Sequence, residues 1–180
     1  MTTLILVRHG ETDWNFERRV QGHSDRPLNE KGRAQAHDLA EALAGEQLDA
    51  VYSSDLVRAH ETARIVAERH RLEVTVVPDL REKNFGTWEG FTDDEIVARF
   101  PEARGGPWGD AETSEDLSER VLAALQRIAD AHAGERVLVV SHGGSMRSAL
   151  RHCGCEASET VANCQIVRLA VEDGRMRRID

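Results

Sequence analysis

The chain has 180 residues, of which 40% are hydrophobic and 31% charged, a composition typical of one globular domain with a sizeable core. Its formal net charge of −9 argues against general binding to nucleic acid or to anionic membranes, because those partners require a basic surface. No apolar run approaches the ~20 residues that span a bilayer, and no signal peptide precedes the first apolar segment, so we expect a cytoplasmic protein.

The cysteines give no sign of a disulfide framework or a metal site. There are three, Cys153, Cys155 and Cys164, and an odd, low number does not suit a set of disulfides. His152 precedes the first of them, but the spacing matches no zinc pattern and a fourth ligand is not evident. We therefore expect reduced thiols and no bound metal.

Short apolar runs alternate along the chain with stretches in which apolar residues recur three and four positions apart. The runs predict buried strands, and the stretches predict amphipathic helices. Asn29 and residues 53–55 suit helix N-caps, Thr92–Glu95 has capping-box spacing, and Asp173-Gly174 suits a hairpin turn. In chain order we expect strands over residues 4–7, 48–53, 74–77, 137–140, 165–171 and 175–179, and helices over residues 31–45, 56–70, 92–100, 117–134 and 144–152.

This order of elements predicts an α/β fold, a three-layer α/β/α arrangement with a mainly parallel central sheet and helices on both faces. We expect residues 1–180 to form a single domain. A polar loop over residues 11–28 follows the first strand. Residues 83–113 form a lid-like insertion, which contains a glycine-rich loop over residues 102–110.

Two of the predicted strands end in the same way. Residues 4–7 run into Arg8-His9-Gly10, and residues 137–140 run into Ser141-His142-Gly143-Gly144. Ligands of open α/β sheets collect beyond the carboxyl ends of the strands. Two strands that end in histidine at one edge of one sheet would therefore make a site.

The other predicted strands add an arginine and a carboxylate to this edge. Arg58 lies in the first turn of the helix after the second strand, and Glu82 follows the third strand. Arginine forks and a helix N-terminus suit a phosphate dianion, and an imidazole with a pKa near ~6.5 is a competent nucleophile at neutral pH. A nearby carboxyl group can protonate a leaving oxygen. The set favours metal-free phosphoryl transfer, although each residue taken alone also fits a purely structural role.

The first of these strand ends also carries a resemblance. Arg8-His9-Gly10-Glu11-Thr12, together with Asn15, resembles the signature of the histidine phosphatase superfamily, the phosphoglycerate mutase-like proteins. The similarity covers nearly the whole chain. It continues through residues 21–22, 25–28, 32, 35–36, 53–59, 62–63, 80–82, 85–90 and 141–144.

The resemblance implies a role for each matching residue. His9 would be the nucleophile that forms a phosphohistidine, and Glu82 would protonate the leaving alcohol and then activate water. The phosphoryl oxygens would be held by Arg8, Asn15, Arg58, His142 and the backbone N–H of Gly143. Gln21 and Gly22 would contact the substrate. No cofactor and no metal are implied.

The chain departs from the family pattern at two places. Glu61 stands where the family often has glutamine, and we expect it to point away from the pocket or to pair with Arg58 or Arg64. Residues 110–113 replace a frequent Gly-Gly-Glu-Ser, which affects the substrate-side lid rather than the phosphate pocket. Four histidines match no catalytic position and are expected at the surface or in packing: His23, His60, His132 and His152.

Hydrolysis of a small phosphorylated metabolite is the function that these features favour. Residues 84–90 resemble the phosphatase branch, and only 59 residues separate Glu82 from His142, whereas the cofactor-dependent mutases usually carry a longer insertion there. The alternatives are a phosphoglycerate mutase and a non-catalytic regulatory relative. The substrate stays open between a broad range of esters, α-ribazole phosphate, and sugar or glycerate phosphates. The oligomeric state is also open, a homodimer included.

Overall fold

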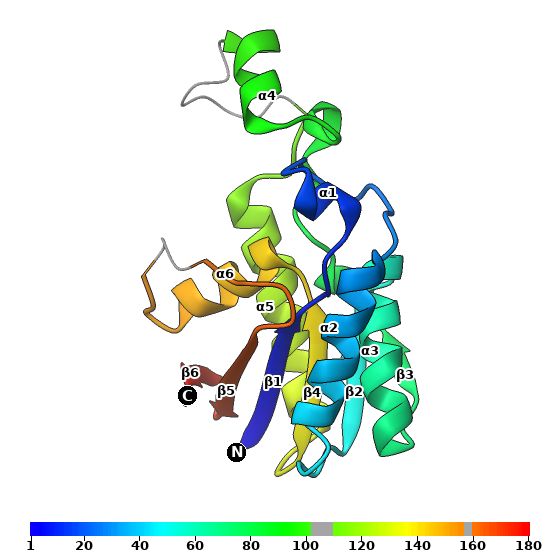
Figure 1. Cartoon of the computed structure of the whole chain (residues 1–180). Helices are drawn as coiled ribbons and strands as arrows, with labels where there is room; N and C mark the ends of the chain where they lie inside the picture. Colours follow the sequence, from blue (N-terminus) through cyan, green and yellow to red (C-terminus); the bar gives the residue numbers. More distant parts are fainter. Residues whose placement is uncertain (102–109, 157–159) are drawn as a thin grey trace.

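A six-stranded sheet forms the centre of the molecule, in the order β3-β2-β4-β1-β5-β6 (Figure 1). The computed structural model describes residues 1–101, 110–156 and 160–180. Parallel pairing joins β3, β2, β4 and β1, whereas β5 and β6 run antiparallel to their neighbours at one edge. The strands are β1 (Thr2–Arg8), β2 (Ala50–Ser53), β3 (Val74–Val76), β4 (Arg136–Ser141), β5 (Ile166–Glu172) and β6 (Arg175–Arg178).

Helices cover both faces of this sheet, which confirms the predicted three-layer α/β/α fold. On one face, α2 and α3 pack against the parallel strands, and on the other face α5 and α6 do so. The helices are α1 (Asp13–Phe16), α2 (Glu30–Ala42), α3 (Val57–His70), α4 (Asp93–Arg99), α5 (Ser114–Ala131) and α6 (Gly143–His152), with two 3₁₀ turns, η1 (Pro78–Leu80) and η2 (Gly86–Trp88).

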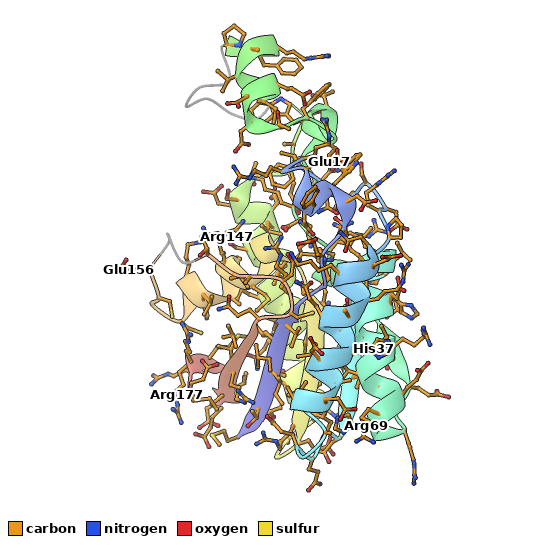
Figure 2. All side chains as sticks on the ribbon, in the orientation of Figure 1. Glu17, His37, Arg69, Arg147, Glu156 and Arg177 are labelled. Carbon is orange, nitrogen blue, oxygen red and sulfur yellow. The ribbon has the colours of Figure 1, made fainter. Side chains whose placement is uncertain are left out.

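The alternation of β1 shows why its apolar run is continuous. Leu4 and Leu6 belong to the core beneath α5 and α6, while Ile5 and Val7 belong to the core beneath α2 and α3. Successive side chains of a strand point to opposite faces, so a strand covered on both faces must be apolar throughout. Charged side chains such as Glu17, Arg69 and Arg177 lie on the outside (Figure 2).

Several local predictions are confirmed in detail. The side chain of Asn29 accepts a hydrogen bond from the N–H of Gly32 at the start of α2, and Thr92 and Glu95 form a capping box at the start of α4. Asp173 and Gly174 both have positive φ, at 49° and 73°, which suits the tight turn between β5 and β6.

Two local predictions were wrong. Residues 11–28 are not all loop, because Thr12 and Asn15 form a capping box that starts the short helix α1. Residues 53–55 provide no side-chain cap for α3, whose N-cap is Leu56. The carboxylate of Asp25 instead accepts a hydrogen bond of 2.7 Å from the N–H of Val57, so the cap comes from a distant loop.

The insertion after Glu82 extends beyond the carboxyl ends of the parallel strands, where α4 stands apart from the sheet (Figure 1). Arg19 ties α4 to the body through Glu95 and the carbonyl of Gly90. Residues 102–109 of the predicted lid, and with them nearly all of the predicted glycine-rich loop, lie outside the described residues. None of the helices in the described ranges combines the length and apolar character needed to cross a bilayer.

Candidate active site

The two strand–histidine ends meet because β1 and β4 are parallel neighbours. Arg8 is paired in register with Ser141, so His9 and His142 leave the sheet side by side, with their ring centroids 5.1 Å apart. Parallel strands deliver their carboxyl ends to one edge. The backbone register therefore accounts for the convergence that the sequence predicted.

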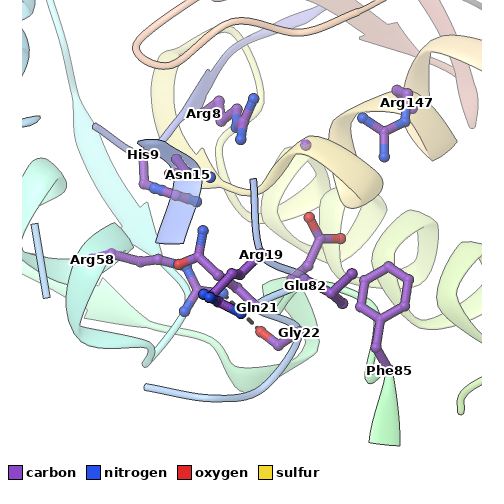
Figure 3. A pocket seen from close by; sticks show the side chains of 12 residues that line it. Arg8, His9, Asn15, Arg19, Gln21, Gly22, Arg58, Glu82, Phe85 and Arg147 are labelled. Carbon is purple, nitrogen blue, oxygen red and sulfur yellow. Dashed lines mark hydrogen bonds between the residues drawn. The ribbon is translucent and has the colours of Figure 1, made fainter. Parts of the chain in front are cut away.

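A pocket of about 180 Å³ opens at this edge (Figure 3). It contains every residue that the sequence nominated except His142, which is fully buried behind His9. The pocket is lined by Arg8, His9, Asn15, Arg19, Val20, Gln21, Gly22, Arg58, Glu82, Phe85, Gly143 and Arg147.

The hydrogen bonding of His9 leaves one ring nitrogen available. Nδ1 lies 2.6 Å from the carbonyl oxygen of Gly10, and because a carbonyl only accepts, Nδ1 carries the proton and Nε2 keeps its lone pair. Burial and the charges of Arg58 and Arg8 hold the pKa of His9 well below 6.5. The imidazole is therefore neutral at pH 7, which is the form that attacks phosphorus.

Close backbone packing holds Gly10 in place. Its N–H donates to the hydroxyl of Thr62 on α3, and a Cβ at this position would lie only 2.4 Å from the carbonyl oxygen of Gly32. Glycine is needed because the loop after β1 lies directly on the start of α2. The orientation of His9 thus depends on two helices of the same face.

His142 is held through Nε2, whereas His9 is held through Nδ1. Its Nε2 lies 2.7 Å from Oγ of Ser54, and its Nδ1 is buried without a partner in the described part of the chain. When the Ser54 hydroxyl donates to Nε2, Nδ1 is an N–H that lacks an acceptor. Burial, Arg58, His9 and Arg8 lower the pKa of His142 well below 6.5.

Arg58, which is buried, and Arg8, which is partly buried, bring positive charge to the inner end of the pocket. Arg58 is completely buried and donates to the carbonyls of Ser24 and Gly22, at 2.9 and 2.7 Å, and Arg8 donates to the carbonyl of Val161 at 2.6 Å. Neither has a carboxylate partner within 4 Å in the described ranges, and the Nε of each is buried without an acceptor there. Burial lowers the pKa of Arg58 to about 10, so it still carries its charge at pH 7.

These buried donors make a site for an anion. An uncompensated buried charge is costly, and a phosphate dianion supplies both the negative charge and the acceptor oxygens that the two guanidinium groups lack. Asn15 uses its Oδ1 to accept from Thr12 and Asn163, which leaves its amide N–H₂ group for the pocket. The residues present therefore fit a phosphoryl group.

Glu82 lies opposite His9 on the loop after η1 (Figure 3). Its two carboxylate oxygens accept from the N–H groups of Gly144 and Lys83, at 2.9 and 2.8 Å. A Cβ on Gly144 would lie 2.1 Å from Oε1 of Glu82, so a larger residue at this position would displace the Glu82 carboxyl group. Gly144, the second glycine of the His-Gly-Gly segment, thus has a role of its own, which its sequence pattern did not indicate.

The backbone around Glu82 is held by side chains that sequence reasoning did not nominate. Arg120 on α5 donates to the carbonyls of Asp79, Arg81 and Glu82, each at 2.8 Å, and pairs with Glu112. Nε2 of His23 lies 2.9 Å from the same Glu82 carbonyl. No local pattern pointed to these contacts, because Arg120 is 38 residues and His23 is 59 residues from Glu82.

The two departures from the family pattern have structural explanations. Glu61 does not line the pocket, which is the first of the two expected alternatives, and it pairs with Arg33 on α2 at 2.7 Å rather than with Arg58 or Arg64. In the 110–113 segment, Asp110 accepts from the N–H and the hydroxyl of Thr87, and Glu112 binds Arg120. This segment therefore fastens η2 and the Glu82 loop to the start of α5.

None of the three cysteines lines the pocket. Cys153, Cys155 and Cys164 are free, and burial raises the pKa of Cys164 to about 12, which makes it a poor nucleophile. In the described portion of the chain, no three His, Cys, Asp or Glu side chains come together in a way that could hold a metal ion.

Comparison with known proteins gives a consistent result. Residues 4–179 match the family model of the histidine phosphatase superfamily (branch 1). The chain is 46% identical over 157 residues to phosphoglycerate mutase-like protein 4 of Arabidopsis thaliana, covering 81% of this chain and 68% of that protein. It is 42% identical over 159 residues to a metal-independent phosphoserine phosphatase of the same plant, covering 82% and 67%.

Solved structures agree with the sequence comparisons. YhfR of Bacillus stearothermophilus superposes with a TM-score of 0.90 at 36% identity, covering 99% of this chain and 95% of that one. A mycobacterial glucosyl-3-phosphoglycerate phosphatase, solved in complex with VO3, superposes with a TM-score of 0.87 at 32% identity, covering 98% and 96%. The chain therefore belongs to the histidine phosphatase superfamily.

Proposed function

We propose that the protein is a metal-independent phosphomonoesterase, which hydrolyses a small phosphorylated metabolite through a phosphohistidine on His9. The observation that carries this proposal is the neutral His9 at the edge of a pocket in which Arg8 and Arg58 lack anionic partners in the described part of the chain. Membership of the histidine phosphatase superfamily supports the same chemistry.

In the first step, Nε2 of His9 attacks the phosphorus and forms the P–N bond while the P–O bond to the leaving alcohol breaks. Glu82 lies across the pocket and gives its proton to the departing oxygen. Arg8, Arg58, the Nδ1–H of His142 and the N–H of Gly143 stabilise the charge that spreads over the transferring oxygens.

In the second step, the Glu82 carboxylate takes a proton from water, and the water oxygen attacks the phosphohistidine. The P–N bond breaks, inorganic phosphate leaves and His9 returns to its neutral form. Both Glu82 oxygens are oriented by backbone N–H groups, so the carboxyl group keeps its place through both proton transfers.

Phosphoglycerate mutase activity is the second candidate, and the name of one close relative, phosphoglycerate mutase-like protein 4, is what favours it. A mutase must keep water from the phosphohistidine while a bisphosphate turns round in the site. Only 59 residues lie between Glu82 and His142, and the long helix α5 takes up much of this stretch. The short insertion supports hydrolysis over mutase activity.

A panel assay tests the proposal. The purified protein is given phosphorylated metabolites in EDTA, and inorganic phosphate is measured; 3-phosphoglycerate is also offered with and without 2,3-bisphosphoglycerate. We expect phosphate release that the bisphosphate does not stimulate. Bisphosphate-dependent isomerisation without phosphate release would show a mutase, and no reaction with any substrate would point to a non-catalytic relative.

Location and assembly remain proposals of the same kind. A cytoplasmic enzyme with a small phosphorylated metabolite as its partner, and without nucleic acid or membrane contacts, agrees with the acidic composition. Cell fractionation tests the compartment, and light scattering of the purified protein tests for a homodimer.

A further inference from the structure

Arg147 lines the pocket, and the proposed mechanism gives it no role. It lies on α6, four residues after Gly143, so both residues occupy the same face of the helix. Its Nη1 lies 3.2 Å from the point where a Cβ on Gly143 would stand. The missing side chain of Gly143 therefore makes room for the Arg147 guanidinium beside the pocket (Figure 3).

The guanidinium of Arg147 has no counter-ion among the residues that the structure describes. It is half-buried, and it makes no hydrogen bond or ion pair with any residue in the described ranges. Arg19, which lines the same pocket, differs, since it is bound by Glu17 and Glu95. Arg147 also lies close enough to Arg8 to repel it, which adds to the effect of burial in lowering the pKa of Arg8. A second anion between the two would remove this repulsion.

The phosphoryl group of a bound substrate would not balance the charge of Arg147 either. A phosphate dianion carries two negative charges, which Arg8 and Arg58 balance, and Glu82 is neutral when it acts as the acid. The positive charge of Arg147 is then left over. Figure 3 shows it on the side of Glu82 and Phe85, away from His9 and Arg58, which is where the leaving alcohol must lie if Glu82 is its proton donor.

We propose that Arg147 forms a second anion subsite in this pocket, which selects phosphomonoesters whose alcohol part carries a carboxylate group. A carboxylate presents two oxygens to the fork of a guanidinium, so it can be held by two parallel hydrogen bonds. This inference rests on the proposed phosphatase function, because it uses Glu82 to identify the leaving-group side.

A matched pair of substrates tests it. O-phosphoserine and O-phosphoethanolamine differ only in the carboxylate, and 3-phosphoglycerate and 2-hydroxyethyl phosphate form a second such pair. We expect the wild type to prefer the carboxylate member of each pair. Arg147→Met should lower kcat/KM for that member by roughly 10- to 100-fold, mainly through KM, and for its partner by less than about threefold. Arg147→Lys should restore part of the loss.

Arg151→Met is the control, since Arg151 is exposed on the same helix one turn further on and should leave both members unchanged. Thermal unfolding of each variant checks that it folds. Equal losses on both members would mean that Arg147 binds the phosphoryl group and would overturn the subsite. Wild-type indifference to the carboxylate would overturn it as well. Failure of the phosphatase proposal is a separate result, in which the wild type hydrolyses no ester of the panel.

Discussion

The ends of β1 and β4 share a histidine followed by glycine, but they hold the two imidazoles by opposite nitrogens. His9 donates from Nδ1 to the carbonyl of Gly10, and Nε2 is left with a lone pair. His142 is bonded at Nε2 to the hydroxyl of Ser54, and Nδ1 is left without a partner within the described ranges. In the proposed mechanism, one strand end thus provides the nucleophile and the other provides a hydrogen-bond donor.

The difference comes from the chemistry of the partner. A carbonyl oxygen only accepts, so the partner of His9 determines which nitrogen carries the proton. A hydroxyl can donate, so Ser54 can leave the proton of His142 on Nδ1, the nitrogen that we propose donates to the phosphoryl group. Two similar stretches of sequence therefore take different roles because a third element, the loop between β2 and α3, bonds only one of them.

Replacing His9 tests the nucleophile and has the largest expected effect. His9→Ala should lower kcat by at least about 10⁴-fold, because removal of a nucleophile abolishes the covalent route. Acid-labile phosphate on the chain during turnover should also disappear, measured with ³²P-labelled substrate. His60→Ala, on α3 outside the pocket, is the control. Labelling that persists in His9→Ala would assign the nucleophile to another residue.

Replacing His142 should have a smaller effect of a different kind. His142→Ala removes one donor to the phosphoryl oxygens, so we expect kcat to fall by roughly 10²- to 10³-fold. The acid-labile label should still form, more slowly, since His9 remains. Rapid-quench measurement of the label gives the rate. Complete loss of labelling in a folded His142→Ala variant would mean that the two histidines cannot be told apart by role.

Ser54→Ala removes only the hydrogen bond between Ser54 and Nε2 of His142, which has no counterpart at His9. His142 loses its partner at Nε2, so either ring nitrogen can carry the proton, and we expect about a tenfold drop in kcat. A buried unpaired nitrogen should lower the free energy of unfolding by about 1–3 kcal/mol, measured by denaturant titration. Ser53→Ala is the control, because Ser53 donates to the carbonyl of Ser54 and does not contact His142. Equal kcat in both variants would argue against a role for Ser54 in setting the tautomer.

The smallest effect is one in which the two histidines should behave alike. Burial first, and then nearby arginines, lower the pKa of both well below the 6.5 of the unfolded chain. The unfolded state therefore takes up protons on acidification that the folded state does not. Stability should be full well above pH 6.5 and should fall between pH 7 and 6 by about 0.7 kcal/mol for each histidine.

Unfolding titrations at the two pH values measure this loss. His9→Gln and His142→Gln should each remove about half of it. A wild type whose stability does not change over this range would show that the two imidazoles titrate in the folded state as they do in the unfolded chain.

Patterns within one element predicted most of the fold. The apolar runs of β1 and β4 and the Asp173-Gly174 turn depend on residues a few positions apart, so they can be predicted from short stretches of sequence. The same holds for the cap of α2 at Asn29. The cap of α3 was missed because its acceptor, Asp25, comes from a loop 32 residues away. The short helix α1 was missed because its capping box uses Asn15 in place of the usual glutamate or glutamine.

Only part of the site followed from the sequence. Strand direction brings His9, Arg58, Glu82 and His142 to one edge, and this much was predictable. The contacts that orient Glu82 were not, since Arg120 reaches its backbone from α5. The place of Arg147 in the pocket wall could have been predicted from its spacing of four from Gly143 on a predicted helix.

The chemical groups that follow each strand could be identified from the sequence, because an apolar run and the residues after it are neighbours along the chain. Three features depend on tertiary contacts instead: which nitrogen of each histidine is free, which carbonyls hold Arg58, and the turn of Glu61 toward Arg33. The physical reason is that a hydrogen bond depends on the one partner within about 3 Å, and that partner comes from a distant part of the chain.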